Sequence, residues 1–397
     1  MLGISERAKN MTPSATMQLT AKVAEMQQKG IDVIKFNLGE PDFNTPANIR
    51  EACKKAIDEG KTKYTPTPGV IELRRAICEK LEKDNGLHYE PQQISFGTGA
   101  KQPIFNTLFM LVNPGDEVII PTPCWVSYVD MVKFCGGVPV LVSTKEDKGF
   151  ALDVDAAAAA VTERTKAIVI NTPNNPTGAV YEGEALRSLV ELALKRGFYI
   201  VSDEVYEKLT YDGAEHVSPA SFSEEAKSVT FTVNGFSKAY AMTGWRAGYV
   251  AGPAEVIAKV NGFQGHSTTN AAAFVQWACI EALKGPQDAL AEMLAQFDRR
   301  RKVMAEGLNA IGFACGMPKG AFYVMPNVSS LFGRSFRGKK LTDSVGAANF
   351  ILEEAHVAVV PGAAFACPDN LRFSYSNSIE NIEKGIAQLA KALGKLN

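Results

Sequence analysis

The chain has 397 residues, of which 46% are hydrophobic and 21% are charged, and its formal net charge is −1. This length is enough for a large core shared by roughly two to three domains. The near-neutral charge gives no indication of a surface that binds nucleic acid or an anionic membrane.

Cysteine and histidine usage indicates a cellular compartment but no metal. The seven cysteines are scattered singly without a C-x-x-C pair, which favours a reducing, cytoplasmic location and no disulfide framework. The four histidines are far apart, so no metal site is expected. Residues 1–7 lack the pattern of a signal peptide, and no apolar run reaches membrane-spanning length. We therefore expect a soluble, globular, cytoplasmic protein.

Strand and helix patterns alternate through the middle of the chain. Helices are expected over 101–112 and 156–160 and around Leu186, Leu189, Val190 and Ala193, which lie on one face at helical spacing. This alternation is typical of an α/β fold with a mostly parallel central sheet covered by helices on both faces. The expected strands cover 94–96, 117–120, 138–142, 166–170, 198–201, 229–233 and 247–251.

From about residue 285 the pattern changes to one long, charged amphipathic helix that reaches about residue 308. Short strands over 321–325, 357–360 and 371–375 and two more helices follow it. We therefore predict a large domain over 46–284 and a smaller α+β domain formed by 1–45 together with 285–397.

Several polar or glycine-rich stretches follow the expected strands. In open parallel sheets, ligands bind beyond the carboxyl ends of the strands. At Gly99 and Ala100 a glycine turn opens a helix, so backbone N–H groups can approach an anion. Asn175 lies in a loop that two X-Pro steps make rigid. Taken alone, each stretch could equally be an ordinary turn.

Three further side chains are candidates for a binding site. Asp203 follows a buried strand, where a carboxylate needs a partner: either backbone N–H groups, as a helix N-cap, or a protonated ring nitrogen. Trp125 could stack on a ring or fill the core. Arg372 lies in an apolar strand without an evident acid, so a substrate carboxylate is a plausible partner.

The most informative stretch is 234–248, which lies between two expected strands. Surroundings that keep Lys238 neutral would make its amine able to form a Schiff base, and Arg246 suits a phosphate. A lysine that reaches past the strand end to solvent is the alternative.

This stretch resembles the lysine signature of class I (fold-type I) aminotransferases, which bind pyridoxal 5′-phosphate (PLP). Over nearly its full length the chain is most similar to the bacterial branch of aspartate aminotransferases, which also contains prephenate and aromatic aminotransferases. Further matching segments are 38–43, 64–69, 174–178, 202–206 and 371–374.

The resemblance implies roles around the cofactor ring. Lys238 would bind PLP covalently and shuttle a proton of the substrate. Asp203 would pair with the pyridine nitrogen, Asn175 and Tyr206 would bind the 3′-oxygen, and Trp125 would stack on the ring. The catalytic residues would then be Lys238, Asp203 and Tyr206.

The resemblance also implies a phosphate site and a homodimer. The backbone at Gly99 and Ala100 would hold the phosphate together with Ser237 and Arg246. Tyr64 would reach the phosphate of the neighbouring subunit, so the two active sites would be shared.

Substrate binding is implied in the same way. Arg372 would clamp the α-carboxylate, helped by Asn175 and the backbone at Gly39, with Trp125 also in contact. The small domain would close over the substrate. Thr16 and Lys101 match residues associated with a distal carboxylate, although Lys101 could equally point to solvent.

We therefore expect a PLP-dependent aminotransferase that converts L-aspartate and 2-oxoglutarate to oxaloacetate and L-glutamate by a ping-pong mechanism. An aromatic, prephenate or alanine aminotransferase on the same scaffold is the nearest alternative. Prephenate-using members tend to have a basic residue where this chain has Thr12, which argues against prephenate. A PLP-dependent lyase or a PLP-binding regulator are more distant alternatives.

Overall fold

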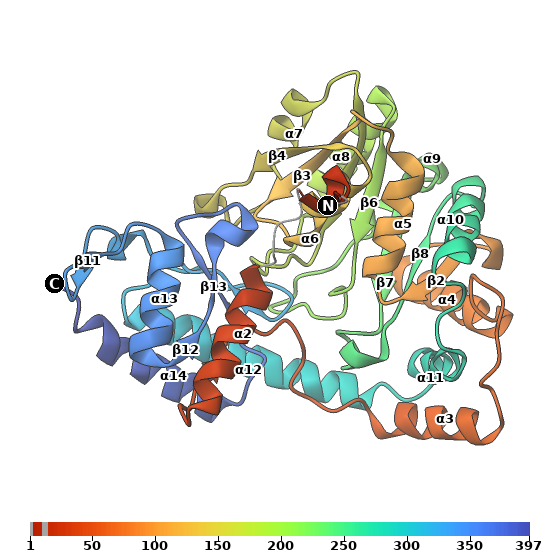
Figure 1. Ribbon diagram of the computed structural model, residues 1–397. Coiled ribbons are helices and arrows are strands. Elements are labelled where there is room, and N and C mark those ends of the chain that lie inside the picture. The colour runs from red at the N-terminus through yellow and green to blue at the C-terminus, as the bar shows by residue number, and fades with distance from the viewer. Residues whose placement is uncertain (1–2, 10–14) are drawn as a thin grey trace.

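The structure, a computed structural model, describes residues 3–9 and 15–397, and for 6–7 and 15–18 it describes the backbone only. A seven-stranded sheet forms the centre of the larger part (Figure 1). Its strand order is β2-β8-β7-β6-β5-β3-β4. The strands are β2 (Ile94–Thr98), β3 (Glu117–Thr122), β4 (Val138–Ser143), β5 (Thr165–Asn171), β6 (Tyr199–Asp203), β7 (Thr230–Gly235) and β8 (Ala247–Ala251).

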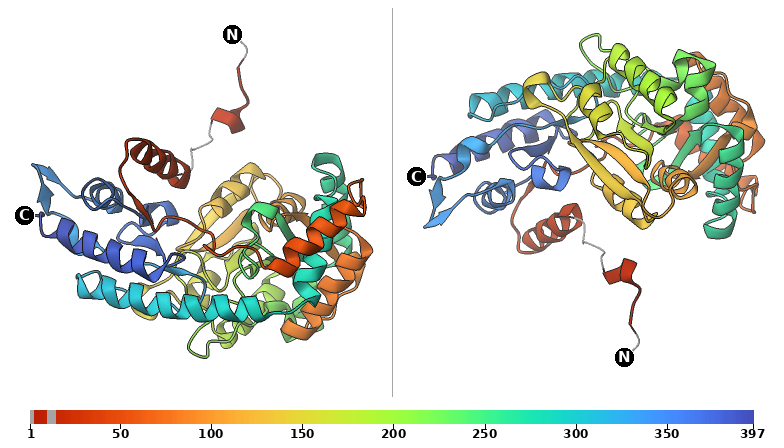
Figure 2. Two further views of the ribbon diagram at one scale, coloured as in Figure 1. Left: turned by 90° about the horizontal axis from the view of Figure 1, so that it is seen from below. Right: turned by 90° about the horizontal axis from the view of Figure 1, so that it is seen from above.

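Only β8 runs against its neighbours: it pairs antiparallel with β2 and β7, whereas the other neighbouring strands are parallel. The predicted α/β class and mostly parallel sheet are therefore confirmed. Helices cover both faces of the sheet (Figure 2). These helices are α3 (Ala47–Asp58), α4 (Ile71–Asn85), α5 (Lys101–Leu111), α6 (Ser127–Phe134), α7 (Val154–Ala160), α8 (Gly183–Arg196), α9 (Glu224–Val229), α10 (Ala254–Ser267) and α11 (Ala273–Lys284).

The apolar runs of the central strands explain why both faces are covered. Successive side chains of a strand point to opposite faces. Val118 and Val169 pack in a core with α5, α6 and α10, whereas Ile119 and Ile168 pack in a core with α7 and α8. A strand that is apolar at every position therefore needs a helical layer on each side.

The remaining elements form a second, smaller part beside the sheet (Figure 1). An antiparallel sheet of order β13-β14-β9 lies near its centre. Its main elements are α12 (Asp288–Ala310), β9 (Tyr323–Val324), α13 (Ser344–Ala355), β13 (Val360–Pro361), β14 (Leu371–Ser374) and α14 (Ile379–Leu393), with a hairpin of β10 (Ser335–Phe336) and β11 (Lys339–Lys340).

The N-terminal segment belongs spatially with this smaller part. After α1 (Glu6–Lys9) and α2 (Ala15–Gln28), strand β1 (Ile34–Lys35) pairs parallel with β12 (Val357–Ala358). Phe36 packs in the same core as Phe297 and Phe373. This arrangement agrees with a small domain built from both ends of the chain, although its boundaries stay a prediction.

The predicted element ends differ from the observed ones in two informative places. The long helix begins at Asp288 rather than near 285, because Gly285 is extended before Pro286, and a residue before proline avoids the helical region. The strand expected over 357–360 is two strands, since β12 pairs with β1 and β13 pairs with β14. Within residues 3–9 and 15–397, no helix combines the length and apolar character needed to cross a bilayer.

Candidate active site

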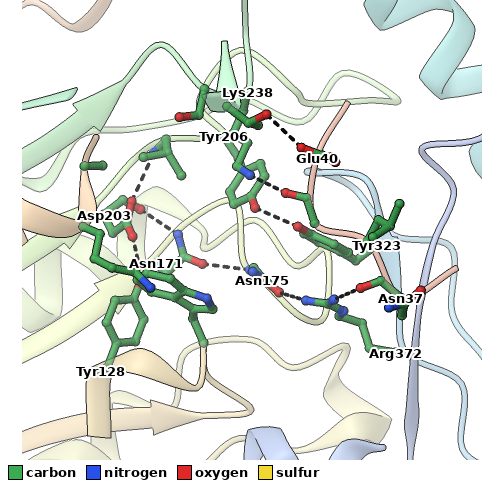
Figure 3. A pocket seen from close by; sticks show the side chains of 18 of the residues that line it. Asn37, Glu40, Tyr128, Asn171, Asn175, Asp203, Tyr206, Lys238, Tyr323 and Arg372 are labelled. Carbon is green, nitrogen blue, oxygen red and sulfur yellow. Dashed lines mark hydrogen bonds between the residues drawn. The ribbon is translucent and has the colours of Figure 1, made fainter. Parts of the chain in front are cut away.

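A cavity of about 710 Å³ lies at the carboxyl ends of the parallel strands, between the larger and the smaller part. Figure 3 shows how its side chains converge. Asp203 ends β6, and Lys238 comes three residues after β7. Arg372 reaches the cavity from β14. The structure thus brings together side chains that three separate sequence segments supply.

Most of the predicted site residues line this one cavity. They are Gly39, Ala100, Lys101, Trp125, Asn175, Asp203, Tyr206, Ser237, Lys238, Arg246 and Arg372. Gly99 lies directly behind it against Arg246. Tyr64 lies outside the cavity and is 90% exposed. Thr16 lies in α2, but its side chain is outside the described residues, as are Thr12 and its neighbours.

Lys238 meets the chemical requirement for a reactive amine. Its Nζ donates a hydrogen bond to the carbonyl oxygen of Gly39 and lies 5.7 Å from the ring centroid of Tyr206. Burial, followed by the positive charge of Arg372, lowers the pKa of Lys238 to about 8. A substantial fraction of this amine is therefore neutral near physiological pH.

Asp203 is a buried carboxylate with neutral partners. Its Oδ2 accepts a hydrogen bond from the hydroxyl of Tyr128 at 2.6 Å, and its Oδ1 accepts from the N–H of Val205 at 3.3 Å. Burial raises the pKa of Asp203 to about 6 despite these bonds. Turns rather than a helix follow it, so the helix N-cap alternative is wrong. A cation placed at this carboxylate would relieve the cost of its burial.

Arg372 is a buried cation held only by amide groups and aromatic rings. Its Nη1 donates to Oδ1 of Asn175 at 3.0 Å, and its Nη2 donates to the carbonyl of Asn37 at 2.8 Å. The guanidinium lies 4.6 Å from the ring centroid of Tyr323 and 5.0 Å from that of Phe365. Among the described residues, no carboxylate pairs with it, and its Nε is buried without a partner. Such a cation can bind a carboxylate from a ligand.

The glycine turn at the start of α5 forms a cradle suited to an anion. A Cβ at Gly99, where φ is +71°, would lie 2.5 Å from Nη2 of Arg246. A Cβ at Gly248 would lie 2.3 Å from the backbone nitrogen of Ala100. Only glycine therefore allows the turn, the first N–H groups of α5 and the guanidinium to lie so close together. These groups present positive charge and N–H donors to the same space, which fits a phosphate.

Sequence reasoning missed several side chains of the cavity. Asn171 donates to the carbonyl of Asp203 at 2.9 Å and accepts from the N–H of Asn175 at 2.8 Å, so it fixes two predicted residues at once. The hydroxyl groups of Tyr206 and Tyr323 lie 3.0 Å apart. Asn171 could have been found as a polar residue at the end of an apolar strand. The other missed residues include the polar side chains of Asn37, Glu40 and Tyr128.

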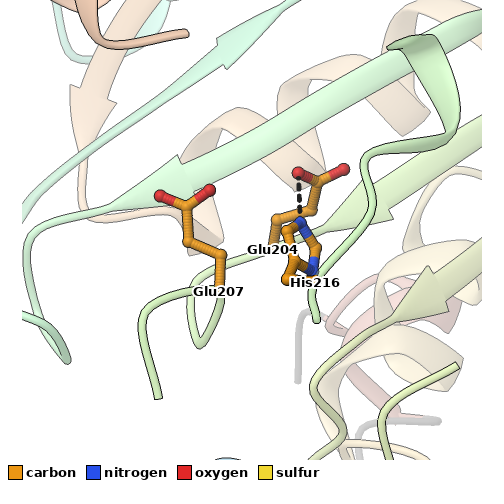
Figure 4. A group of neighbouring side chains, drawn as sticks. All are labelled: Glu204, Glu207 and His216. Carbon is orange, nitrogen blue, oxygen red and sulfur yellow. Dashed lines mark hydrogen bonds and ion pairs between the residues drawn. The ribbon is translucent and has the colours of Figure 1, made fainter. Parts of the chain in front are cut away.

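A second buried group of ionisable side chains lies behind the Asp203 turn (Figure 4). Glu204, Glu207 and His216 each offer a possible metal ligand, and these ligand atoms lie within 4.8 Å of one another. However, Lys80 forms an ion pair with Glu207, and His216 Nε2 lies 2.9 Å from Oε2 of Glu204. Burial alone would raise the pKa of Glu207, but Lys80 and His216 outweigh it and hold this pKa at about 2. We assign the cluster as an ion-pair network in which Lys80 supplies the cation.

Comparisons with known proteins place this cavity in a family context. The model of the family "Aminotransferase class I and II" matches residues 31–389. The chain is 48% identical to the "Probable aspartate/prephenate aminotransferase" of Aquifex aeolicus, over 99% of each chain. It is similar to the structure of an aspartate aminotransferase from Rhizobium meliloti, with a TM-score of 0.97 and 41% identity over 100% of both chains. A Thermus thermophilus aspartate aminotransferase with maleate gives a TM-score of 0.93 at 44% identity, over 99% of this chain and 100% of that one.

Proposed function

Because the chain belongs to the class I and II aminotransferases, we propose that it transfers the amino group of L-aspartate to 2-oxoglutarate, giving oxaloacetate and L-glutamate. The observation that carries this proposal is the pairing of two groups in one cavity. Lys238 has an amine with a lowered pKa, and Arg372 is a buried cation without a carboxylate partner among the described residues. The amine can bind a carbonyl group or take up a proton, while the guanidinium holds the carboxylate of an amino or keto acid.

The family uses PLP, and we propose that this chain binds it covalently at Lys238. When bound, PLP supplies an electron sink that makes the substrate Cα–H acidic. The N–H groups at Gly99 and Ala100 would hold its phosphate, with Ser237 and Arg246. Its ring would be held by Asp203 at the pyridine nitrogen, Asn175 and Tyr206 at the 3′-oxygen, and Trp125 on one face.

The residues of this chain would then divide the work of the reaction. Once the substrate amine has displaced it from the cofactor, Nζ of Lys238 would take the proton that leaves the substrate Cα and later return it, and its lowered pKa suits it to act as a base near neutral pH. Arg372 grips the α-carboxylate with its fork of donors and thereby orients the Cα–H bond. The segment around Gly39, which already accepts a hydrogen bond from Lys238, covers the cavity and helps to exclude water.

The choice of a dicarboxylate rests on a cation in the cavity. Lys101 lines the cavity, and its Nζ lies 4.7 Å from the ring centroid of Trp125, so its charge is available to a ligand. We propose that Lys101, with Thr16, binds the distal carboxylate. A relative named for aspartate and prephenate favours prephenate as a second candidate acceptor. An aromatic or alanine preference on the same scaffold would leave the roles of Lys238 and Arg372 unchanged.

Two features of the assembly are also proposals. We infer a homodimer in which Tyr64, which its own subunit leaves 90% exposed, contacts the phosphate bound by the neighbouring subunit. We also infer that 1–45 with 285–397 closes as a small domain over a large domain of 46–284. The pairing of β1 with β12 supports this division, because it ties the N-terminal segment to the C-terminal part.

An amino-donor screen of the PLP-loaded protein tests the proposed function. With 2-oxoglutarate as acceptor, L-aspartate should give oxaloacetate, measured by coupled NADH oxidation, faster than phenylalanine or alanine gives its keto acid. Lys101→Met should lower kcat/KM for aspartate about 10-fold more than for phenylalanine, as expected for one exposed charged contact. Equal losses would reject the role of Lys101. Release of ammonia, pyruvate or CO₂ without an acceptor would indicate a lyase instead.

A further inference from the structure

Two fully buried glutamines hold the loop that carries Tyr64. Gln276, in α11, accepts a hydrogen bond at Oε1 from the N–H of Val70 at 2.8 Å. Its Nε2 donates to Oγ1 of Thr65 and to the carbonyl of Ala271, both at 2.9 Å. This glutamine therefore fixes the two ends of the segment 65–70, next to Tyr64.

Gln264, in α10, joins the same loop to the phosphate side of the active site. Its Nε2 donates to the carbonyl of Thr67 at 3.0 Å and to the carbonyl of Phe96 at 2.8 Å. Its Oε1 lies 3.4 Å from Nδ2 of Asn106. Phe96 lies in β2, which leads into the glycine turn, and Asn106 lies in α5, whose N-terminus forms the anion cradle.

These contacts are costly to replace. A buried carboxamide that loses its partners, or leaves a buried carbonyl unpaired, destabilises the local structure by about 1–3 kcal/mol. The fold nevertheless uses two such groups on a surface loop that carries a tyrosine 90% exposed. A loop fixed in this way holds the Tyr64 ring at a defined place outside its own subunit.

We propose that Gln264 is a positioning residue that links the two cofactor sites of the dimer. Through Phe96 it fixes the glycine turn of its own subunit, and through Thr67 it fixes the loop that presents Tyr64 to the partner. Among the described residues, the side chain of Gln276 hydrogen-bonds only the loop and the carbonyl of Ala271, so we expect it to act on the partner's site. This inference rests on the proposed PLP-binding homodimer.

Heterodimers with a single covalent site separate the two effects. Two differently tagged chains are co-expressed, and one carries Lys238→Ala, so only the other chain gives the visible band of lysine-bound PLP. Gln264→Met or Gln276→Met, which remove the amide but keep a similar size, is placed in either chain. The readout is the dissociation constant of PLP from the visible site, which does not depend on turnover.

The change in the PLP dissociation constant should depend on which chain of the heterodimer carries the substitution. Gln276→Met should raise the dissociation constant about 10-fold when it lies in the Lys238→Ala chain and leave it unchanged in the other chain. Gln264→Met should raise it about 10-fold in either position. Gln388 lies in α14, and its Oε1 has no hydrogen-bond partner among the described residues. The substitution Gln388→Met should therefore have no effect in either chain.

Three results would overturn the inference while leaving the proposed function intact. They are an effect of Gln276→Met only within its own subunit, an equal effect of Gln276→Met in both placements, or an effect of Gln264→Met in fewer than both placements. If Gln276→Met does not fold, Thr65→Val removes one of its hydrogen bonds and should weaken PLP binding in the partner about 3-fold. By contrast, a monomer or a wild-type protein without the visible band would contradict the proposed function itself.

Discussion

The turn from Asp203 to Glu207 has two buried faces with opposite electrostatics. On the far face, Glu207 pairs with Lys80 and Asn85, while Glu204 accepts hydrogen bonds from Ser202 and Ser218. On the cavity face, Asp203 has only neutral partners (Figure 3). Across the cavity, Arg372 has no carboxylate partner among the described residues.

The pKa values follow this difference. Lys80 and its neighbours hold the pKa of Glu207 at about 2, whereas burial raises the pKa of Asp203 to about 6 and lowers that of Lys238 to about 8. A paired buried charge serves the fold, but an unpaired one costs stability and persists where a ligand completes the pair. Burial alone therefore does not identify the site; the missing counter-charge does.

The largest expected effect is on the reactive amine. Lys238→Ala should lower the rate of transamination by at least about 10⁴-fold, because it removes both the attachment point and the proton carrier. Stopped-flow measurement of the half-reaction with L-aspartate would show this loss, while PLP binding measured by equilibrium dialysis should persist. Substantial turnover in the variant would remove Lys238 from its assigned role.

Arg372→Met tests the role of the unpaired charge in the cavity. Loss of the α-carboxylate clamp should lower kcat/KM roughly 100- to 1000-fold for all amino and keto acids alike. Urea unfolding of the PLP-free variant should nevertheless show little net change in stability, because removal of an unpaired buried charge offsets the hydrogen bonds that Asn175 and Asn37 lose. A defect confined to dicarboxylates would reassign Arg372 to the distal carboxylate.

Glu207→Gln tests the opposite face. It leaves the ammonium of Lys80, whose side chain is 8% exposed, with only its longer ion pair to Asp84 at 3.9 Å. We expect the free energy of unfolding to fall by about 3 kcal/mol. The matched control is Glu51→Gln, which removes an exposed ion pair with Lys54 and should change nothing measurable. Equal stability of both variants would mean that the network does not hold the turn.

The smallest effect is a pH dependence that Lys238 should impose on the PLP-free protein. Its pKa of about 8 in the folded chain lies below the ordinary value of 10.5, so the unfolded chain binds more protons between these values. Stability contributed by this group therefore rises with pH across that window. Lys238→Met should be more stable than the wild type at pH 7, and the gap should narrow toward pH 10. A gap that stays constant with pH would contradict the lowered pKa.

The sequence predicts one side of this comparison better than the other. Asp203 and Lys238 follow apolar strands, and parallel strands place their carboxyl ends at one edge, so both were found. Because these strands are apolar at nearly every position, the sequence also predicts a layer of helices on each face of the sheet. Tyr323 was missed because only the antiparallel pairing of β14 with β9 brings it beside Arg372. The hydrogen bond between Arg372 and Asn37 joins residues 335 positions apart, so no local sequence pattern could predict it.

The ion-pair network was missed for a related physical reason. The sequence shows that acidic residues follow one another at the turn, at Asp203, Glu204 and Glu207. It does not show which of these carboxylates forms an ion pair, because the cation, Lys80, comes from α4. Lys80 looks like any surface lysine of an amphipathic helix until the helix packs against the turn. Counter-charge is a tertiary property, so the sequence could indicate candidate charges but not which of them lack a partner.

The visible absorption spectrum of the PLP-saturated protein, taken before and after single amino acids are added without an acceptor, tests the central claim most directly. We predict a yellow band that L-aspartate and L-glutamate bleach, because the amino group passes to the cofactor while Arg372 holds the carboxylate. Bleaching by phenylalanine or alanine but not aspartate would keep the reaction and change the substrate. A saturated protein without the band would contradict the assignment of Lys238 and the function built on it.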